Sequence, residues 1–231
     1  LLFPIYYFIG ALNNKFLSIT PNSFTESTWF LIFAFILGHV VQARAKVFVE
    51  NRIKIRYWNG VFLSELYLIK GSKSCTDIDR KKYIELAKER FSYTDEELSL
   101  LDTDSKESRE LCQSIYRKLR AFIENNNVGG TVSIENTYYN FFRGLSQASI
   151  YSSLIVLLRI AYDLKTLSDR HWRLQNMDYK NAVSVLLLLF FIYAYFLFKE
   201  RARQRGEYHV QAVYNTAYSL SLGGKTNEKH C

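Results

Sequence analysis

The apolar residues of this chain are gathered into a few blocks between charged stretches, instead of recurring at the period of a helix or a strand. A helix needs about 20 consecutive, mostly apolar residues to cross a bilayer. Four blocks approach that requirement: Leu1–Leu12, Thr28–Val41, Leu145–Leu164 and Asn181–Phe198. Because the 231 residues include only 2 Pro and 10 Gly, a turn-rich β-fold is disfavoured. The sequence predicts an all-α membrane protein with about four transmembrane helices.

Two of these blocks leave a second interpretation open. Leu1–Leu12 is short for a span, but the chain begins inside this run without a methionine, so we expect a leading segment before it. The alternative is a buried or interfacial helix. Leu145–Leu164 contains four serines and Arg159, which keeps a soluble core helix open. In a span, the serines can bond to helix carbonyls, and Arg159, one turn from Asp163, can either reach water by snorkelling or serve an ion path.

Basic residues are in excess, giving a formal net charge of +8, and they cluster beside the apolar blocks. Arg44 and Lys46 follow the second block, Arg143 precedes the third and Lys199 follows the fourth. Because cytoplasmic flanks of spans carry such an excess, both termini are expected on the cytoplasmic side. Attraction to nucleic acid or to anionic lipid would use the same residues, so charge alone does not separate these roles.

The apolar blocks divide the chain into four parts. We expect a transmembrane hairpin over 1–42, a cytoplasmic helical domain over 43–144 inserted between spans two and three, a second hairpin over 145–198 and a cytoplasmic helical tail over 199–231. At the start of the inserted domain, residues 43–57 continue the second span as a basic amphipathic helix, with apolar residues Val47, Val49, Ile53 and Ile55.

Further helices are expected over 77–91, 95–101 and 105–125, and Thr94 and Glu97 form a capping box for the second of them. A last cytoplasmic helix runs from Thr131 into the third span, and the fourth span continues into the tail. These two long helices can transmit a rigid movement from the cytoplasmic domain to the membrane.

The sequence lacks the phosphate-loop, dinucleotide-binding, zinc-protease, serine-hydrolase and calcium-loop patterns. Its four histidines are scattered, so no metal site is predicted, and no cofactor or enzymatic activity is expected. Cys75, Cys112 and Cys231 form no CxxC pair, and we interpret them as reduced, non-catalytic thiols.

Polar residues at the membrane ends of the spans are the candidates for function. His39 and Gln42 close the second span, where they can line or gate a pore, or can simply pair with neighbouring side chains. With Arg159 they form the candidate pore and gating set. The candidate ligand-binding set consists of basic and aromatic residues that can hold phosphates and stack a base: Arg201, Arg203, Arg205, Tyr208, His209, Arg143 and Arg120. For the arginines after the fourth span, a purely topological anchor is the alternative.

Three segments carry a resemblance to a known family: Gly38–Gln42 (GHVVQ), Tyr138–Gln147 (YYNFFRGLSQ) and Arg201–Tyr214 (RARQRGEYHVQAVY). The chain resembles the small membrane effectors of bacterial antiphage defence, most of all those of the Hailong system. The resemblance implies a homo-oligomeric channel, a tetramer, in the bacterial inner membrane. It also implies a partner nucleotidyltransferase whose oligodeoxyadenylate, or another nucleotide signal, opens the pore and depolarises the infected cell.

Two other functions remain open on the sequence alone. A membrane sensor or scaffold could dock a soluble partner protein on its basic, aromatic surface without conducting ions. A membrane-anchored ribonuclease could use Arg203 and His209, which have the Arg-x5-His spacing of a class of metal-independent ribonucleases.

Overall fold

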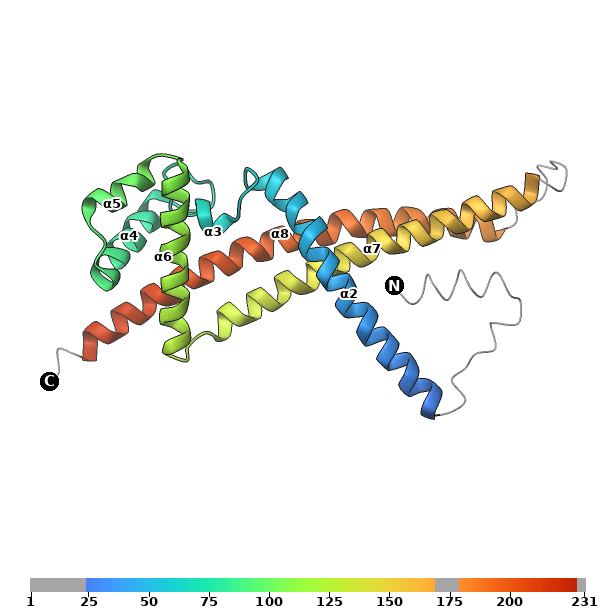
Figure 1. Ribbon diagram of the computed structural model, residues 1–231, viewed down its shortest axis with the longest axis horizontal. Coiled ribbons are helices and arrows are strands. Elements are labelled where there is room, and N and C mark those ends of the chain that lie inside the picture. Colours follow the sequence, from blue (N-terminus) through green and yellow to red (C-terminus); the bar gives the residue numbers. More distant parts are fainter. Residues whose placement is uncertain (1–23, 169–178, 228–231) are drawn as a thin grey trace. The chain divides into compact units, whose positions relative to one another are not determined.

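The computed structural model describes residues 24–168 and 179–227, with side chains over 35–163 and 182–223, and these residues are helical with no strand. The α-helices are α2 (Phe24–Tyr57), α3 (Leu63–Leu66), α4 (Asp77–Phe91), α5 (Asp95–Ser99), α6 (Lys106–Asn125), α7 (Gly130–Ser168) and α8 (Tyr179–Asn227), and a 3-10 turn, η2 (Leu100–Asp102), follows α5 (Figure 1). The all-α prediction is confirmed for this part of the chain. The first apolar block, Leu1–Leu12, lies outside the described residues.

The chain divides into two compact units. Unit 1 comprises Leu1–Glu50 and Phe141–Arg201, and unit 2 comprises Asn51–Asn140 and Ala202–Cys231. Helices α2, α7 and α8 each begin in one unit and end in the other, so they contribute residues to both.

Within the described residues, two helices are long enough and contain an 18-residue window apolar enough to cross a membrane, one within Gly130–Asp163 of α7 and one within Ala182–Gly223 of α8. Each helix is longer than one span. Only 33% and 17% of their most apolar windows are buried, which disfavours a soluble core helix for the third and fourth blocks. The second block forms the first turns of α2. Its role as a span, like the total of four spans, stays a prediction.

The apolar parts of α7 and α8 in unit 1 turn their polar groups inward and their large apolar groups outward. The buried polar side chains on these helices include Ser146, Gln147, Ser149, Ser152 and Ser184. The exposed ones include Leu157, Leu158, Leu186, Leu189, Phe190 and Tyr193. This distribution is the reverse of a water-soluble core and suits a surface covered by lipid.

The serines of α7 find hydrogen-bond partners within unit 1, as a span requires. Ser149 and Ser153 donate from their hydroxyls to carbonyl oxygens one turn earlier, each over 2.9 Å. Ser146 donates across to the carbonyl oxygen of Tyr195 on α8, over 3.3 Å. The predicted bonding of these serines to helix carbonyls is confirmed, and it ties α7 to α8.

The core of unit 2 is built around α6, whose buried face is Cys112, Ile115, Leu119 and Ile123. These positions recur every three or four residues, so they form one stripe along the helix. Helix α6 packs on α3 and η2. A second part of the core is aromatic: the ring of Tyr214 on α8 lies 4.8 Å from that of Tyr67 and 5.0 Å from that of Tyr83.

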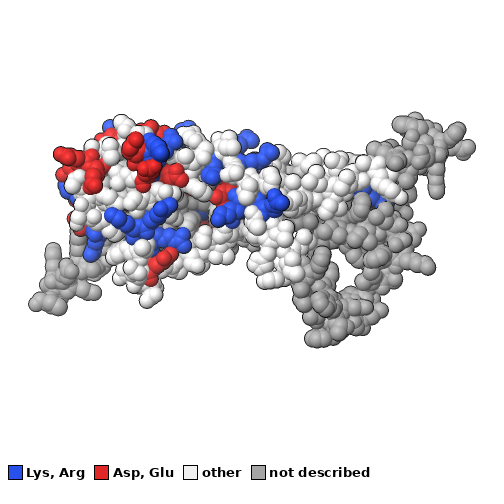
Figure 2. All heavy atoms as spheres, viewed as in Figure 1, with Lys and Arg blue, Asp and Glu red and all other residues white. Residues whose placement is uncertain are grey.

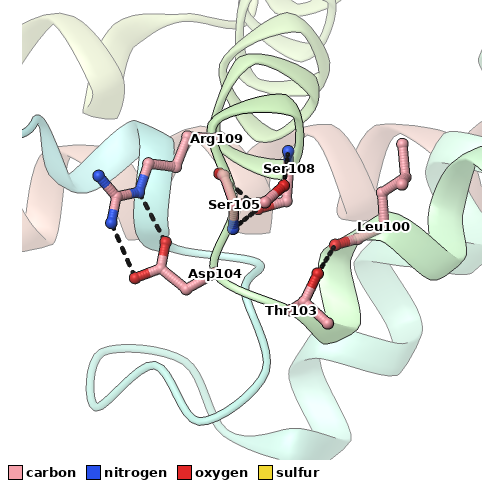
Figure 3. A network of polar contacts seen from close by, with 6 residues as sticks. All are labelled: Leu100, Thr103, Asp104, Ser105, Ser108 and Arg109. Carbon is pink, nitrogen blue, oxygen red and sulfur yellow. Dashed lines mark hydrogen bonds and ion pairs between the residues drawn. The ribbon is translucent and has the colours of Figure 1, made fainter.

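The starts of α5 and α6 are fixed by capping boxes, in which side chains bind the first free backbone N–H groups of the helix. Thr94 and Glu97 form the predicted capping box of α5. Helix α6 begins with a second box, in which Ser105 and Ser108 each accept from the backbone N–H of the other (Figure 3). Beside it, Arg109 donates to both carboxylate oxygens of Asp104 over 2.6 and 2.9 Å, which fixes the chain's entry into α6.

Candidate ligand site

A cavity of about 410 Å³ lies in unit 2 where the end of α6, the start of α7 and the C-terminal half of α8 meet. Its lining consists of Arg120, Ile123, Glu124, Asn127, Gly129, Val132, Ser133, Asn136 and His209. The volume falls within the range of small-molecule sites, and the mixture of two aliphatic groups with amide, hydroxyl, imidazole and guanidinium groups suits a polar ligand.

His209 is held by partners on two other helices. Its Nε2 lies 3.0 Å from the hydroxyl oxygen of Tyr116 on α6, and its Nδ1 lies 3.2 Å from the carbonyl oxygen of Val132 on α7. A carbonyl can only accept, so Nδ1 carries the proton and Nε2 accepts from Tyr116 in the neutral ring. These contacts orient His209 as a fixed wall of the cavity.

The surroundings of His209 keep it neutral. Burial lowers the pKa of the imidazole below its usual value, and the positive charge of Arg120 acts in the same direction. The hydrogen bond to the carbonyl of Val132 opposes these effects, as does the negative charge of Glu135. At neutral pH the lining therefore carries one positive charge, on Arg120, and one negative charge, on Glu124, and the two are paired because Nε of Arg120 donates to Glu124 over 2.8 Å.

A smaller cavity of about 120 Å³ adjoins the first, since Asn136 and His209 line both. The smaller cavity is aromatic and includes Trp58, Tyr116 and Tyr139 in its lining. Gly206 of α8 lies against two of these rings: a Cβ at this position would be 3.0 Å from Trp58 and 3.2 Å from Tyr139. The glycine thus allows α8 to approach the rings closely.

The structure brings only two of the seven predicted ligand residues, Arg120 and His209, into this cavity. Arg203 instead donates to Glu207 over 2.6 Å and lies over the ring of Tyr57. Arg205 donates to Glu135 over 3.0 Å.

The other three predicted ligand residues are also not among the residues that line the cavity. The guanidinium of Arg205 covers the exposed ring of Tyr208 at 5.8 Å. Arg143 and Arg201 belong to unit 1. A single ligand site made of all seven predicted residues stays a prediction.

Several lining residues were not singled out from the sequence, namely Asn127, Ser133 and Asn136. A weak signal existed for Asn127, because it ends the Asn125–Asn127 run and precedes two glycines. Its φ of 55° is left-handed, a conformation that asparagine adopts more readily than most residues.

The predicted gating residues lie in unit 1. Gln42 on α2 packs against Gly144 on α7, where a Cβ would collide with the Gln42 amide. His39 is exposed and touches the edge of Phe35, with ring centroids 4.4 Å apart. Arg159 donates from Nε to Asp163 over 2.7 Å, as their spacing predicted.

A buried ion pair between Glu50 of α2 and Arg143 of α7 was missed by the sequence analysis. Both side chains are at most 10% exposed, and both belong to unit 1. Glu50 is the one acidic residue among the basic side chains of 43–57, and this isolated negative charge was the available sequence signal for an ion pair. With Gln42 and Gly144, this pair joins α2 to α7.

The proposed ribonuclease pair is not assembled within one chain. Residues six apart on a helix differ by about 240° around its axis, so Arg203 and His209 face different directions. Arg203 is engaged with Glu207, and His209 with Tyr116 and Val132. Among the residues with described positions, no group of three or more His, Cys, Asp and Glu side chains could hold a metal ion.

Comparison of this chain with protein-family models, with curated proteins and with solved structures finds no match. The resemblance to antiphage membrane effectors therefore rests on the three sequence segments alone. The structure adds that residues of the second and third segments, Tyr139 and Gly206, meet at the smaller cavity.

Proposed function

We propose that this chain is an oligomeric, ligand-gated membrane effector, whose cytoplasmic part binds a nucleotide-type signal and whose spans open in response. One observation carries the proposal. Helices α7 and α8, which line the cavity through Asn136 and His209, are the same two helices that are apolar enough to cross a membrane. A ligand that moves the cavity walls therefore acts directly on the helices that continue into the candidate spans.

The chemistry of the cavity supports a ligand with hydrogen-bonding edges and with a phosphate that competes with Glu124 for Arg120. Arg120 supplies a guanidinium for a phosphate. The amides of Asn127 and Asn136 and the hydroxyl of Ser133 offer both donors and acceptors, and an asparagine amide can pair with the edge of a purine base. The oligodeoxyadenylate implied by the family resemblance combines these groups.

The remaining parts of the proposal come from the sequence. The chain would form a tetramer in the bacterial inner membrane, with His39, Gln42 and Arg159 as pore or gating residues. A partner nucleotidyltransferase would supply the signal, and the resulting conductance would depolarise the infected cell. The outward-facing apolar side chains of α7 and α8 support the membrane location.

Conductance of the purified chain in a planar bilayer tests the proposal directly. Current should appear only after short oligodeoxyadenylates are added on the cytoplasmic side. The variants Arg120→Gln and Asn136→Ala should raise the ligand concentration needed for opening. Arg117→Gln on α6 is the matched control, since Arg117 is exposed and lies outside the cavity lining.

Three results would count against this function. Silence with and without ligand, from folded and inserted protein, together with a stoichiometric soluble partner, would favour the scaffold instead. Opening that is unchanged in both cavity variants would remove the cavity as the ligand site. RNA cleavage that is lost in His209→Ala would revive the ribonuclease.

A further inference from the structure

Helix α2 has two apolar faces along its cytoplasmic half, and only one of them is covered. The covered face consists of Val41, Ala45, Val49 and Ile53, all at most 7% exposed. On another side of the helix, Val47, Phe48 and Ile55 remain 54%, 50% and 73% exposed. Large apolar side chains repeated on one exposed helix face indicate a surface that something else covers.

The exposed apolar residues have cationic neighbours. Residues three and four apart on a helix adjoin, so Arg44 lies beside Val47 and Phe48, and Ile55 lies beside Arg52. Arg44, Lys46, Arg52 and Arg56 are all exposed, and within the described residues no acidic side chain forms an ion pair with them. We call Arg44, Val47, Phe48, Arg52, Ile55 and Arg56 the α2 strip.

The charge of the α2 strip differs from that of the arginines on α8. Arg203 and Arg205 are each neutralised by a glutamate, Glu207 and Glu135, at 2.6 and 3.0 Å. The arginines of the α2 strip have no such ion pair among the described residues, so their positive charge is available to an anionic partner. Arg56 makes a cation–π contact with the ring of Tyr57, whose centroid lies 5.7 Å from the guanidinium carbon.

The position of the α2 strip selects the partner. It begins three residues after the apolar block that ends at Val41, about 4.5 Å along the helix, and it runs about 18 Å further to Arg56. Because a headgroup layer is only about 5–7 Å deep, a strip of this length stays within the layer when its helix lies close to the membrane plane. Within unit 1, Figure 1 shows α7 and α8 running together while α2 crosses them steeply, and Glu50 and Arg143 pair at this crossing. If α7 and α8 span the bilayer, this crossing brings α2 towards the bilayer plane, which is the arrangement that the α2 strip needs and which differs from the second span predicted from the sequence.

We propose that the α2 strip lies on the cytoplasmic leaflet and binds anionic phospholipid. The guanidiniums of Arg44, Arg52 and Arg56 bind headgroup phosphates, and Val47, Phe48 and Ile55 insert among the upper acyl carbons. Such a mixture of basic and apolar side chains is the pattern of helices that lie in a membrane interface. Nucleic acid would satisfy the arginines and leave the three apolar side chains in water. This inference rests on the membrane location in the proposed function.

Depth-dependent quenching in the full-length chain tests the proposal. An environment-sensitive fluorophore is attached at Phe48→Cys or Ile55→Cys in a Cys231→Ser background, and the protein is inserted into vesicles that contain brominated lipid and phosphatidylglycerol. Both labels should be quenched by the brominated chains. Ile78→Cys on α4, 70% exposed, is the control that should not be quenched.

A second arm tests the anionic lipid. Replacing phosphatidylglycerol with phosphatidylcholine, or combining Arg44→Gln, Arg52→Gln and Arg56→Gln, should weaken quenching at both positions, by about fivefold in partitioning for each arginine. The control pair Lys81→Gln and Arg117→Gln removes exposed charges elsewhere and should change nothing. Equal quenching in both lipids, and in the protein with and without the three arginine substitutions, would overturn the lipid-binding role.

A positive control separates this inference from the proposed function. A label at Leu186→Cys, on the exposed apolar face of α8, reports whether the spans are in the bilayer. Quenching at 186 with none at 48 and 55 overturns the α2 strip alone. No quenching at any of the three positions overturns the membrane location as well. Cross-linking of position 48 between two copies, without lipid quenching, would replace the lipid with a second copy of the chain.

Discussion

The hydroxyl oxygen of Tyr116 lies 3.0 Å from Nε2 of His209, and this contact joins α6 to α8 at the wall of the larger cavity. The second ring nitrogen of His209 is bound to the carbonyl of Val132 on α7. One neutral imidazole thus connects the three helices that form the cavity. Protonation of Nε2 would turn this nitrogen from an acceptor into a donor, so the Tyr116 hydroxyl could no longer donate its hydrogen bond to the ring.

The pKa of His209 makes the stability of unit 2 depend on pH. Because burial lowers this pKa in the folded chain, the unfolded chain binds more protons below the usual value of about 6.5. Stability is therefore complete above that value and falls as the pH drops through it towards the lowered pKa. The thermal unfolding midpoint, followed by circular dichroism between about pH 7.5 and 5, should decrease on acidification.

His209→Gln is the matched control for this pH dependence, since glutamine keeps a donor and an acceptor but does not titrate in this range. The variant should show a flatter profile between pH 7.5 and 5. The carboxylate of Asp104, whose pKa is lowered by Arg109, loses its contribution only at more acidic pH and does not confuse the result. Equal slopes for the two proteins would show that His209 is not the titrating group.

Breaking the buried pair of Glu50 and Arg143 should destabilise the α2–α7 contact strongly. Glu50→Gln breaks a buried pair by removing the charge of one partner, a change that costs about 3–5 kcal/mol in comparable sites. Unfolding of the detergent-solubilised chain should be measured against Glu110→Gln. That control breaks an exposed pair with Lys106 at 3.9 Å and should cost less than about 1 kcal/mol. Similar effects of the two substitutions would contradict the structural role of Glu50.

Two helix glycines should respond differently to alanine. Alanine favours a helix over glycine by about 1 kcal/mol at each position. At Gly206 the added Cβ would lie 3.0 Å from the buried ring of Trp58 and 3.2 Å from the ring of Tyr139. Displacing a buried indole costs more than turning a flexible side chain, so overpacking should outweigh that gain by about 1–2 kcal/mol. At Gly144 it meets the flexible end of Gln42, which can turn aside. Gly206→Ala should therefore lower the thermal midpoint more than Gly144→Ala; the reverse order would contradict this packing.

The helices and their starts could be predicted because their signals are local. The expected helix over 77–91 coincides with α4, and the Thr94–Glu97 capping box forms as its spacing predicted. Apolar blocks likewise marked the apolar parts of α7 and α8. These features depend on residues within a few positions of one another, so no knowledge of the tertiary fold is needed.

The candidate site could not be predicted because its members come together from distant segments. Glu135 neutralises Arg205 across 70 residues of sequence, and no local pattern indicates this pair. Asn136 and His209 likewise meet only because α7 and α8 pack together in unit 2. On α2, the sequence grouped Val47 and Ile55 with Val49 and Ile53 in one amphipathic pattern. In the fold, Val49 and Ile53 are buried whereas Val47 and Ile55 are exposed.

The thiols of Cys75 and Cys112 should react slowly in the native chain. Burial raises the pKa of each to about 11, so at pH 8 only about one thiol in a thousand is ionised, against about one in four for an ordinary cysteine. In a Cys231→Ser variant, a disulfide-exchange reagent should modify native protein at least a hundredfold more slowly than denatured protein. The native rate should then rise about tenfold for each pH unit between 8 and 10. Rapid modification of Cys75 at pH 8 would contradict its raised pKa and would indicate a reactive thiol in the loop before α4.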